Sequence, residues 1–209
     1  MIAKYKIEAF KVQKPIAMLE TKFGGQPNWI SEPCWPLSKS LQKPMKFLGQ
    51  FVLYPEIFGS ILPQIAYLFM TDSKDQFVSG TWLPDGGENA VILQPGKQYS
   101  HAIKILQGPT IEDENTKQEC EYGIKKEFGY DNENQHLGSK ETSYLDENKI
   151  GGTPFFLQYF EYPGLGRWKL IAQIQSTIIP QELNFGDAGI GYIFLSHDIS
   201  EAKFIWQSI

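Results

Sequence analysis

The chain has 209 residues, of which 42% are hydrophobic and 21% charged, and its net charge is −5. This length and composition predict a globular protein with a sizeable core, and the negative charge argues against a nucleic-acid-binding surface. No stretch approaches the roughly 20 apolar residues of a membrane span. The two cysteines are too few for a disulfide framework or a thiolate zinc site. We expect a cytoplasmic protein without a metal or cofactor.

The first element that the sequence predicts is a half-buried strand over Ala3–Val12. Polar and apolar residues alternate there, so that Ala3, Tyr5, Ile7 and Ala9 fall on one face. A period of two is typical of a strand with one face in the core. The same stretch lacks the apolar run of a signal peptide.

A motif of fifteen residues follows and returns later in the chain. KFGGQPNWISEPCWP at Lys22–Pro36 matches KIGGTPFFLQYFEYP at Lys149–Pro163. The lysines, the Gly-Gly pairs and the prolines recur at a constant offset, and aromatic residues recur between them. We interpret the motif as an architectural corner in which glycine supplies a positive backbone φ or a close approach between chains.

Three further strand-like segments recur in the same order. Lys46–Phe51 matches Lys169–Ile174, Ile65–Met70 matches Ile190–Leu195, and Val91–Gln94 matches Phe204–Gln207. We therefore predict an internal duplication, with one copy over residues 16–95 and the second over residues 149–209. The last strand is expected over Ala202–Ser208.

Two stretches of the first copy read as turns. Pro55–Pro63 predicts a loop with at most one turn of helix. Val78–Asn89 contains Pro-Asp-Gly-Gly, a sequence that favours a tight turn. We expect a hairpin there, with Trp82 exposed near its tip.

The connector Glu112–Asn148 is acidic. It holds eleven acidic residues and four lysines, a net charge of about −7, whereas the rest of the chain carries about +2. Within it, Lys117–Phe128 has the best helical pattern, because Cys120, Ile124 and Phe128 are spaced four residues apart and Thr116 can cap the helix.

These elements together predict a β-rich α+β fold. We expect one domain over residues 1–209, in which two copies of mostly antiparallel strands are related by a pseudo-twofold axis. Helices should be few and concentrated around the connector. The alternative is two discrete subdomains divided near residues 110–148.

The repeated motifs resemble those of a known family. K-[FI]-G-G-x-P with a following aromatic, the central [FL]-[LI]-[GA]-Q-[FI] and the closing G-I-G-Y-I-F-L are similar to the bacterial YwqG-like family of cytosolic proteins. K-x-G-G-x-P-x-[WF] is also similar to the signature of eukaryotic TYP-domain proteins, which act as chaperones for a small-subunit ribosomal protein. The zinc-binding module of many TYP-domain proteins has no counterpart in this sequence.

The candidate site residues are polar groups inside repeated segments. Gln50 and Gln173 occupy equivalent places in apolar strands, and buried amides are costly unless they are hydrogen-bonded. They either bond to the backbone of a neighbouring loop or meet in a cleft on the pseudo-twofold axis. Lys22 and Lys149 are either solvated, paired with a carboxylate, or directed at an anionic ligand.

Other chemistries have weaker support. The glycines of FGDAGIG precede a strand instead of following one, unlike a dinucleotide fingerprint. The three histidines are scattered, and Cys34 is expected to be a buried, unreactive thiol. We therefore name no catalytic or metal-ligating residue. Trp35 and Trp82 are candidate anchors for a partner protein.

Two functions stay open. The first is a non-enzymatic module that holds or neutralises a partner protein, as the chaperone likeness and the toxin–immunity neighbourhoods of some relatives imply. The acidic connector suits a basic partner, because complementary charge steers encounter. The alternative is an enzyme or small-ligand receptor, with Gln50 or Gln173 in a cleft between the copies.

Overall fold

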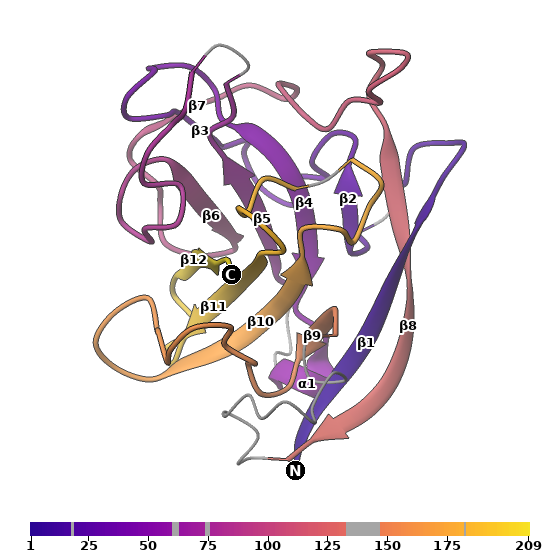
Figure 1. The fold of residues 1–209 in the computed structure, drawn as a ribbon, viewed down its shortest axis with the longest axis vertical. Helices are drawn as coiled ribbons and strands as arrows, with labels where there is room; N and C mark the ends of the chain where they lie inside the picture. Colours follow the sequence, from indigo (N-terminus) through magenta and orange to yellow (C-terminus); the bar gives the residue numbers. More distant parts are fainter. Residues whose placement is uncertain (18, 60–62, 74–75, 133–146, 182) are drawn as a thin grey trace.

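The computed structural model describes the chain except for residues 18, 60–62, 74–75, 133–146 and 182. Its only helix within the described residues is α1 (Pro55–Phe58), a single turn in the segment expected to hold at most one turn of helix. The strands of the first half are β1 (Ile2–Lys11), β2 (Lys22–Gly24), β3 (Trp35–Pro36), β4 (Lys46–Val52), β5 (Ile65–Met70), β6 (Asn89–Gln94) and β7 (Ala102–Ile103). Those of the second half are β8 (Glu121–Asp131), β9 (Lys149–Gly151), β10 (Trp168–Gln175), β11 (Ile190–Ser196) and β12 (Ala202–Gln207) (Figure 1).

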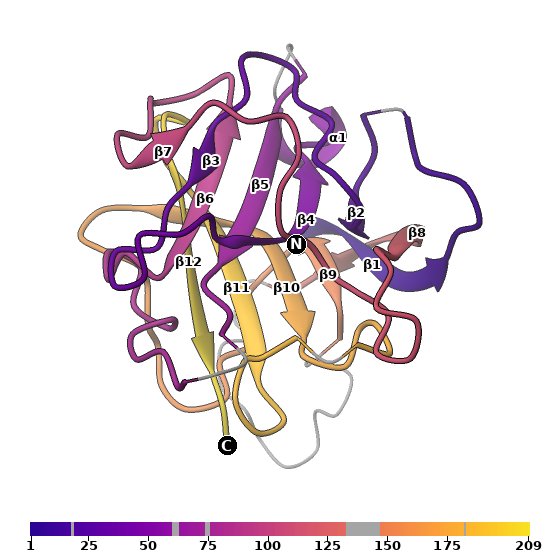
Figure 2. The ribbon, with the colours of Figure 1, turned by 90° about the horizontal axis from the view of Figure 1, so that it is seen from above.

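Ten strands form one antiparallel sheet in the order β12-β11-β10-β9-β1-β8-β2-β4-β5-β6. The long ribbon of β1 and β8 lies at the centre and carries four strands on either side. The sheet curls until its end strands β6 and β12 lie against each other (Figure 2). At this junction the backbone N–H of Lys97 donates to the carbonyl of Ser200 at 2.8 Å. The short strands β3 and β7 form a separate pair.

The predicted N-terminal strand is confirmed as β1. Ile7 is buried, and Ala3, Tyr5 and Ala9 pack against the same core, as the alternation predicts. Lys6 and Glu8 face solvent. The sequence pattern therefore located both the strand and its inner face.

The helix expected over Lys117–Phe128 is wrong, because this stretch forms most of strand β8. Ten residues of β8 pair with β1, from Tyr122 opposite Lys11 to Asp131 opposite Ile2. A spacing of four residues is also a multiple of two, so Ile124 and Phe128 share one face of a strand as readily as one face of a helix. Pairing along the whole of β1 decides between the two structures.

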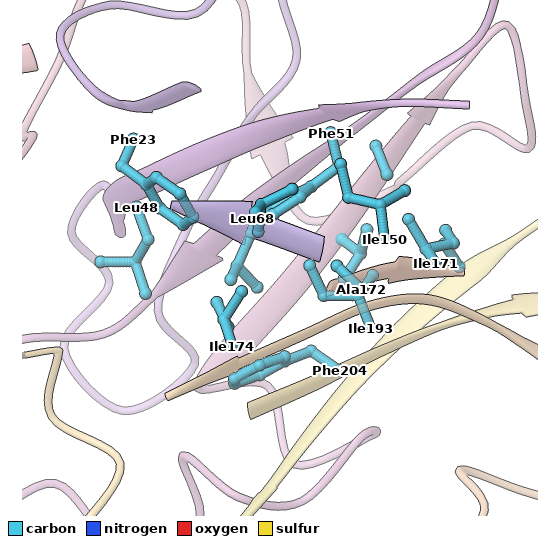
Figure 3. Close-up of a cluster of buried hydrophobic side chains, with 14 of the residues drawn as sticks. Phe23, Leu48, Phe51, Leu68, Ile150, Ile171, Ala172, Ile174, Ile193 and Phe204 are labelled. Atoms are coloured by element: carbon cyan, nitrogen blue, oxygen red, sulfur yellow. The ribbon is translucent and has the colours of Figure 1, made fainter. Parts of the chain in front are cut away.

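Most residues are buried on both faces of the sheet in β4, β5, β6, β10 and β11, which explains the continuous apolar runs of these strands. The inner face holds a core to which both halves contribute (Figure 3): Phe23, Leu48, Phe51, Leu68, Ile150, Ile171, Ala172, Ile174, Ile193 and Phe204. Alternate residues of the same strands point outward into two further clusters. The first-half outer cluster comprises Trp35, Met45, Phe47, Ile65, Tyr67, Phe69, Ala90 and Ile92. The second-half outer cluster comprises Phe156, Leu170, Ile190, Tyr192, Phe194 and Ile205.

The hairpin expected over Val78–Asn89 is also wrong. The described residues up to Glu88 form successive turns, and Asn89 begins β6. Trp82 is half-buried instead of exposed, because its ring packs edge-on against Trp206 with ring centroids 5.8 Å apart. Trp82 thus helps to join the loop before β6 to the edge strand β12.

The β-rich class is therefore confirmed, whereas the expected helices around the connector are absent from its described residues. Residues of both halves of the chain share one sheet and one inner core. None of the helical residues that the structure describes forms a span long and apolar enough for a membrane.

Candidate functional site

Lys22 and Lys149, at the two Gly-Gly corners, are buried and form ion pairs with opposite ends of β8. The Nζ atom of Lys22 lies 2.8 Å from Oε1 of Glu121, and that of Lys149 lies 2.8 Å from Oδ2 of Asp131. Because β8 is 11 residues long, the two pairs lie roughly 30 Å apart along it. The corners do not face each other across one cleft.

Asp131 makes more polar contacts than Glu121. It also accepts a hydrogen bond from the backbone N–H of Thr153 at 2.9 Å, and Lys4 lies 2.7 Å from its other oxygen. Burial alone would raise the pKa of Asp131, but the contacts with Lys149 and Lys4 outweigh it and lower the pKa overall. Burial lowers the pKa of Lys149, an effect that Asp131 partly offsets.

The second glycine of each corner makes room for the carboxylate. Gly25 and Gly152 have φ values of +61° and +76°, in the left-handed region. A Cβ at Gly25 would lie 2.5 Å from Oε2 of Glu121, and one at Gly152 would lie 2.3 Å from Oδ2 of Asp131. The repeated Gly-Gly therefore provides both the turn and the space for an ion pair.

Gln50 and Gln173 are buried, and each amide bonds to backbone beside the corner of its own half. Gln50 accepts from the N–H of Asn28 at 2.9 Å and donates to the carbonyl of Glu20 at 2.8 Å. Gln173 accepts from the N–H of Phe155 at 2.8 Å and donates to the carbonyl of Glu147 at 3.0 Å. These contacts anchor the chain on either side of each corner.

Two tyrosines and two more glutamines repeat the pattern. The hydroxyl of Tyr67 donates to the carbonyl of Asn28 at 2.8 Å, and that of Tyr192 donates to the carbonyl of Phe155 at 2.7 Å. Burial raises the pKa of both tyrosines, so both hydroxyls stay protonated donors. Gln94 and Gln207 likewise donate to loop carbonyls, at 2.8 and 2.9 Å.

A family model described as a domain of unknown function (DUF1963) matches residues 21–205 of this chain. The chain belongs to this family. The matched range includes both Gly-Gly corners and β8, so the two buried ion pairs lie inside the DUF1963 domain. A comparison with curated proteins finds no match.

The tryptophans predicted as anchors lie in different surroundings in the DUF1963 domain. Trp35 is 0% exposed, and its indole N–H donates to the carbonyl of Met45 at 2.8 Å. It belongs to the first-half outer cluster. Trp82 is half-buried against Trp206. As the protein stands, neither ring projects from the surface as a free anchor.

The two thiols are poorly suited to nucleophilic chemistry. Burial raises the pKa of both Cys34 and Cys120, which favours the unreactive thiol over the thiolate. Cys34 is half-buried and Cys120 buried. Within the described ranges, no group of three or more metal-ligating side chains is brought together.

One loop of the second half exposes several large apolar side chains. Tyr159 is 63% exposed, Tyr162 is 41% exposed and Leu165 is fully exposed. Tyr162 stays anchored, because its ring centroid lies 5.5 Å from that of Phe156 and 5.4 Å from that of Phe194. We call Tyr159, Tyr162 and Leu165 the second-half apolar surface; such exposed residues often mark an interaction site.

A cavity of about 510 Å³ also lies between the halves. Lys46 and Met70 line it from the first half, Asp113 from the connector, and Gln181 and Asn184 from the second half. Neither Gln50 nor Gln173 lines this cavity. A cleft between the halves is therefore present, but it uses other residues than the sequence suggested.

The sequence pattern did not identify the carboxylates or the exposed loop. Glu121 and Asp131 contribute to the acidic charge of the connector, and the signal for their role is that a lysine in an apolar strand requires a buried partner. The repeated motif held a signal for the loop, because Tyr162 aligns with Trp35 in the comparison of the two motifs.

Proposed function

We propose that this DUF1963 domain is a non-enzymatic protein-binding module that holds a partner polypeptide on its second-half apolar surface. The observation that carries the proposal is the exposure of Tyr159, Tyr162 and Leu165 on one loop. Partly exposed aromatic residues on a packed base supply large contact area at low entropic cost. The candidate polar residues Gln50, Gln173, Lys22 and Lys149 serve the scaffold, through the internal contacts described above.

We also propose that the two halves arose by internal duplication and are related by an approximate twofold axis through the β1–β8 ribbon. Equivalent residues supply the support: the ion pairs, the amide contacts and the tyrosine hydrogen bonds recur in both halves. A register irregularity recurs as well, between Phe47 and Gly49 in one half and between Leu170 and Ala172 in the other. Under this proposal, each residue of one half can be compared with the equivalent residue of the other half.

The motif likeness to the YwqG-like family and to TYP-domain chaperones supports a partner-holding role of a chaperone or immunity type. On the same basis, and because both cysteines are free thiols, we propose a cytoplasmic location. A basic partner is proposed from the connector, where Glu112, Glu114 and Glu127 are exposed.

The test is purification of the tagged chain from its native host after mild crosslinking, followed by mass determination of the complex. We expect one partner protein at a fixed stoichiometry. Leu165→Asp should reduce its recovery at least tenfold, because a charge replaces an exposed apolar contact. Ile199→Asp, at an exposed residue on another loop, is the matched control and should leave recovery unchanged. Recovery of no stoichiometric partner would refute the proposal.

The cavity between the halves supports a second candidate function, a small-ligand receptor. Its supporting observation is that both halves and the connector line one space of about 510 Å³, a volume in the range of ligand pockets. Gln181 and Asn184 offer amide donors and acceptors there. Screening metabolites by thermal shift tests it, and Asn184→Leu should abolish any shift that arises in this cavity.

A further inference from the structure

In the first half, the outer face of the sheet is covered by a segment of the chain itself. Strand β7 pairs antiparallel with β3, with Trp35 opposite Ile103 and Pro36 opposite Ala102. The N–H of Leu37 donates to the carbonyl of His101 at 2.9 Å. Side chains of this covering segment, residues 99–105, pack on the first-half outer cluster: Tyr99, Ile103 and Ile105. The covering segment thus acts as an extended ligand built into the chain.

In the second half, Tyr162 packs on the second-half outer cluster in the way that Trp35 packs within the first-half outer cluster. The ring centroids of Trp35 and Phe69 are 5.2 Å apart with an interplanar angle of 66°. Those of Tyr162 and Phe194 are 5.4 Å apart with an angle of 56°. Both rings pack edge-on or tilted over a corresponding phenylalanine, so the aromatic packing beneath Trp35 and beneath Tyr162 is alike.

The two halves differ in the chain segment that covers the outer cluster. No strand formed by the described residues pairs with Tyr162–Pro163. Among the described residues, the partly buried side chains that pack on the second-half outer cluster are Phe155, Leu157 and Trp168, and these belong to its own corner loop and strand. As a result Tyr162 is 41% exposed, whereas Trp35 is 0% exposed. Gly164 occupies the place of Leu37, the residue whose N–H bonds to the covering segment in the first half.

We propose that Tyr162–Pro163 binds an extended apolar segment of a partner polypeptide as an added antiparallel strand, in the way that β3 binds β7. This inference rests on the proposed function and names its binding mode. The segment should carry apolar side chains at alternate positions, like Ile103 and Ile105, and pack them on the second-half apolar surface. Its backbone should pair with Tyr162 and with the N–H of Gly164. Strand addition of this kind takes affinity from main-chain bonds and specificity from alternate side chains.

The probe is a synthetic peptide with the sequence of residues 98–106, QYSHAIKIL, added to the full isotope-labelled chain and followed by amide NMR. We expect saturable shifts of the Tyr162 and Gly164 amides. Tyr162→Asp should weaken peptide binding at least tenfold. The matched control Phe77→Asp, at another exposed aromatic residue, should leave it unchanged. A peptide with aspartate in place of both isoleucines should not bind, which keeps the test valid if Tyr162→Asp is unstable.

Two results would overturn the inference. One is the absence of saturable shifts at Tyr162 and Gly164. The other is shifts confined to Trp35 and Leu37, which would mean that the peptide only displaces the covering segment. Different results would refute the binding mode and the proposed function. If a stoichiometric cellular partner binds the parent and Tyr162→Asp equally, strand addition is wrong and protein binding stands. If the parent has no partner, the proposed function itself is wrong.

Discussion

Removing the charge of Asp131 is predicted to destabilise the protein strongly. Asp131 is 2% exposed and Lys149 is 1% exposed, so Asp131→Asn leaves a buried ammonium without its counter-charge. Breaking a buried pair on one side costs about 3–5 kcal/mol, a large part of the roughly 5–15 kcal/mol that stabilises a typical domain. Lys4, 2.7 Å from the same carboxylate, loses a contact as well.

The assay is equilibrium unfolding in guanidinium chloride followed by the fluorescence of the five tryptophans. The variant Asp131→Asn/Lys149→Met removes both charges and should regain at least about 1 kcal/mol over Asp131→Asn alone. Glu32→Gln, in the exposed pair with Lys104, should show no measurable change. A value for Asp131→Asn within about 1 kcal/mol of the parent would refute the reasoning, as would a double variant no more stable than the single one.

Three further predictions follow from the corners and their amides. The pKa of Asp131 is lowered in the folded state, so its stabilisation is present above the ordinary carboxyl pKa and is lost as the pH falls through the folded value. The free energy of unfolding of Asp131→Asn should therefore depend less on pH than that of the parent below about pH 4. Identical pH dependence in the two proteins would contradict this. Gln173→Leu should cost about 2–6 kcal/mol in the same denaturant assay, because the Phe155 N–H and the Glu147 carbonyl lose their partner; Gln175→Leu on the same strand is the control with the smaller loss. Gly25→Ala should lower the melting temperature far more than Gly59→Ala. Both glycines have a positive φ, but only a Cβ at Gly25 meets a neighbour, the Glu121 carboxylate at 2.5 Å. Equal shifts in melting temperature would show that backbone strain alone matters.

Strands with a clear inner face were predictable from the sequence. In β1 the alternation around Ile7 reflects contact with a single core, so local pattern and tertiary packing agree. The Gly-Gly motifs were predictable as corners, because all four of their glycines adopt the positive φ that glycine favours. The structure adds that Gly25 and Gly152 also accommodate carboxylates.

The connector shows where local pattern fails. The spacing of Ile124 and Phe128 fits a helix and a strand equally, and only the pairing of β8 with β1, about 120 residues away in sequence, decides. The exposed Trp82 was wrong for a related reason. Its partner Trp206 lies on β12, and no turn propensity around Pro-Asp-Gly-Gly carries that information.

The candidate site was only partly accessible from sequence. Gln50 and Gln173 were found because amides stand out in apolar strands, and their two interpretations differ only in long-range contacts. The exposure of Tyr162 depends on long-range pairing: β7 pairs with β3, whereas no strand formed by the described residues pairs with Tyr162–Pro163. The local sequence around Tyr162 carries no information on that difference.

The most direct test of the central claim is photo-crosslinking in the native host from position 162. A photoreactive phenylalanine analogue in place of Tyr162 should give one discrete adduct with a partner protein, because this side chain lies at the proposed binding surface. The same analogue in place of Phe77, an exposed aromatic residue outside the connector and the second-half apolar surface, should give none. Absence of an adduct from position 162, or an equal adduct from both positions, would contradict the account.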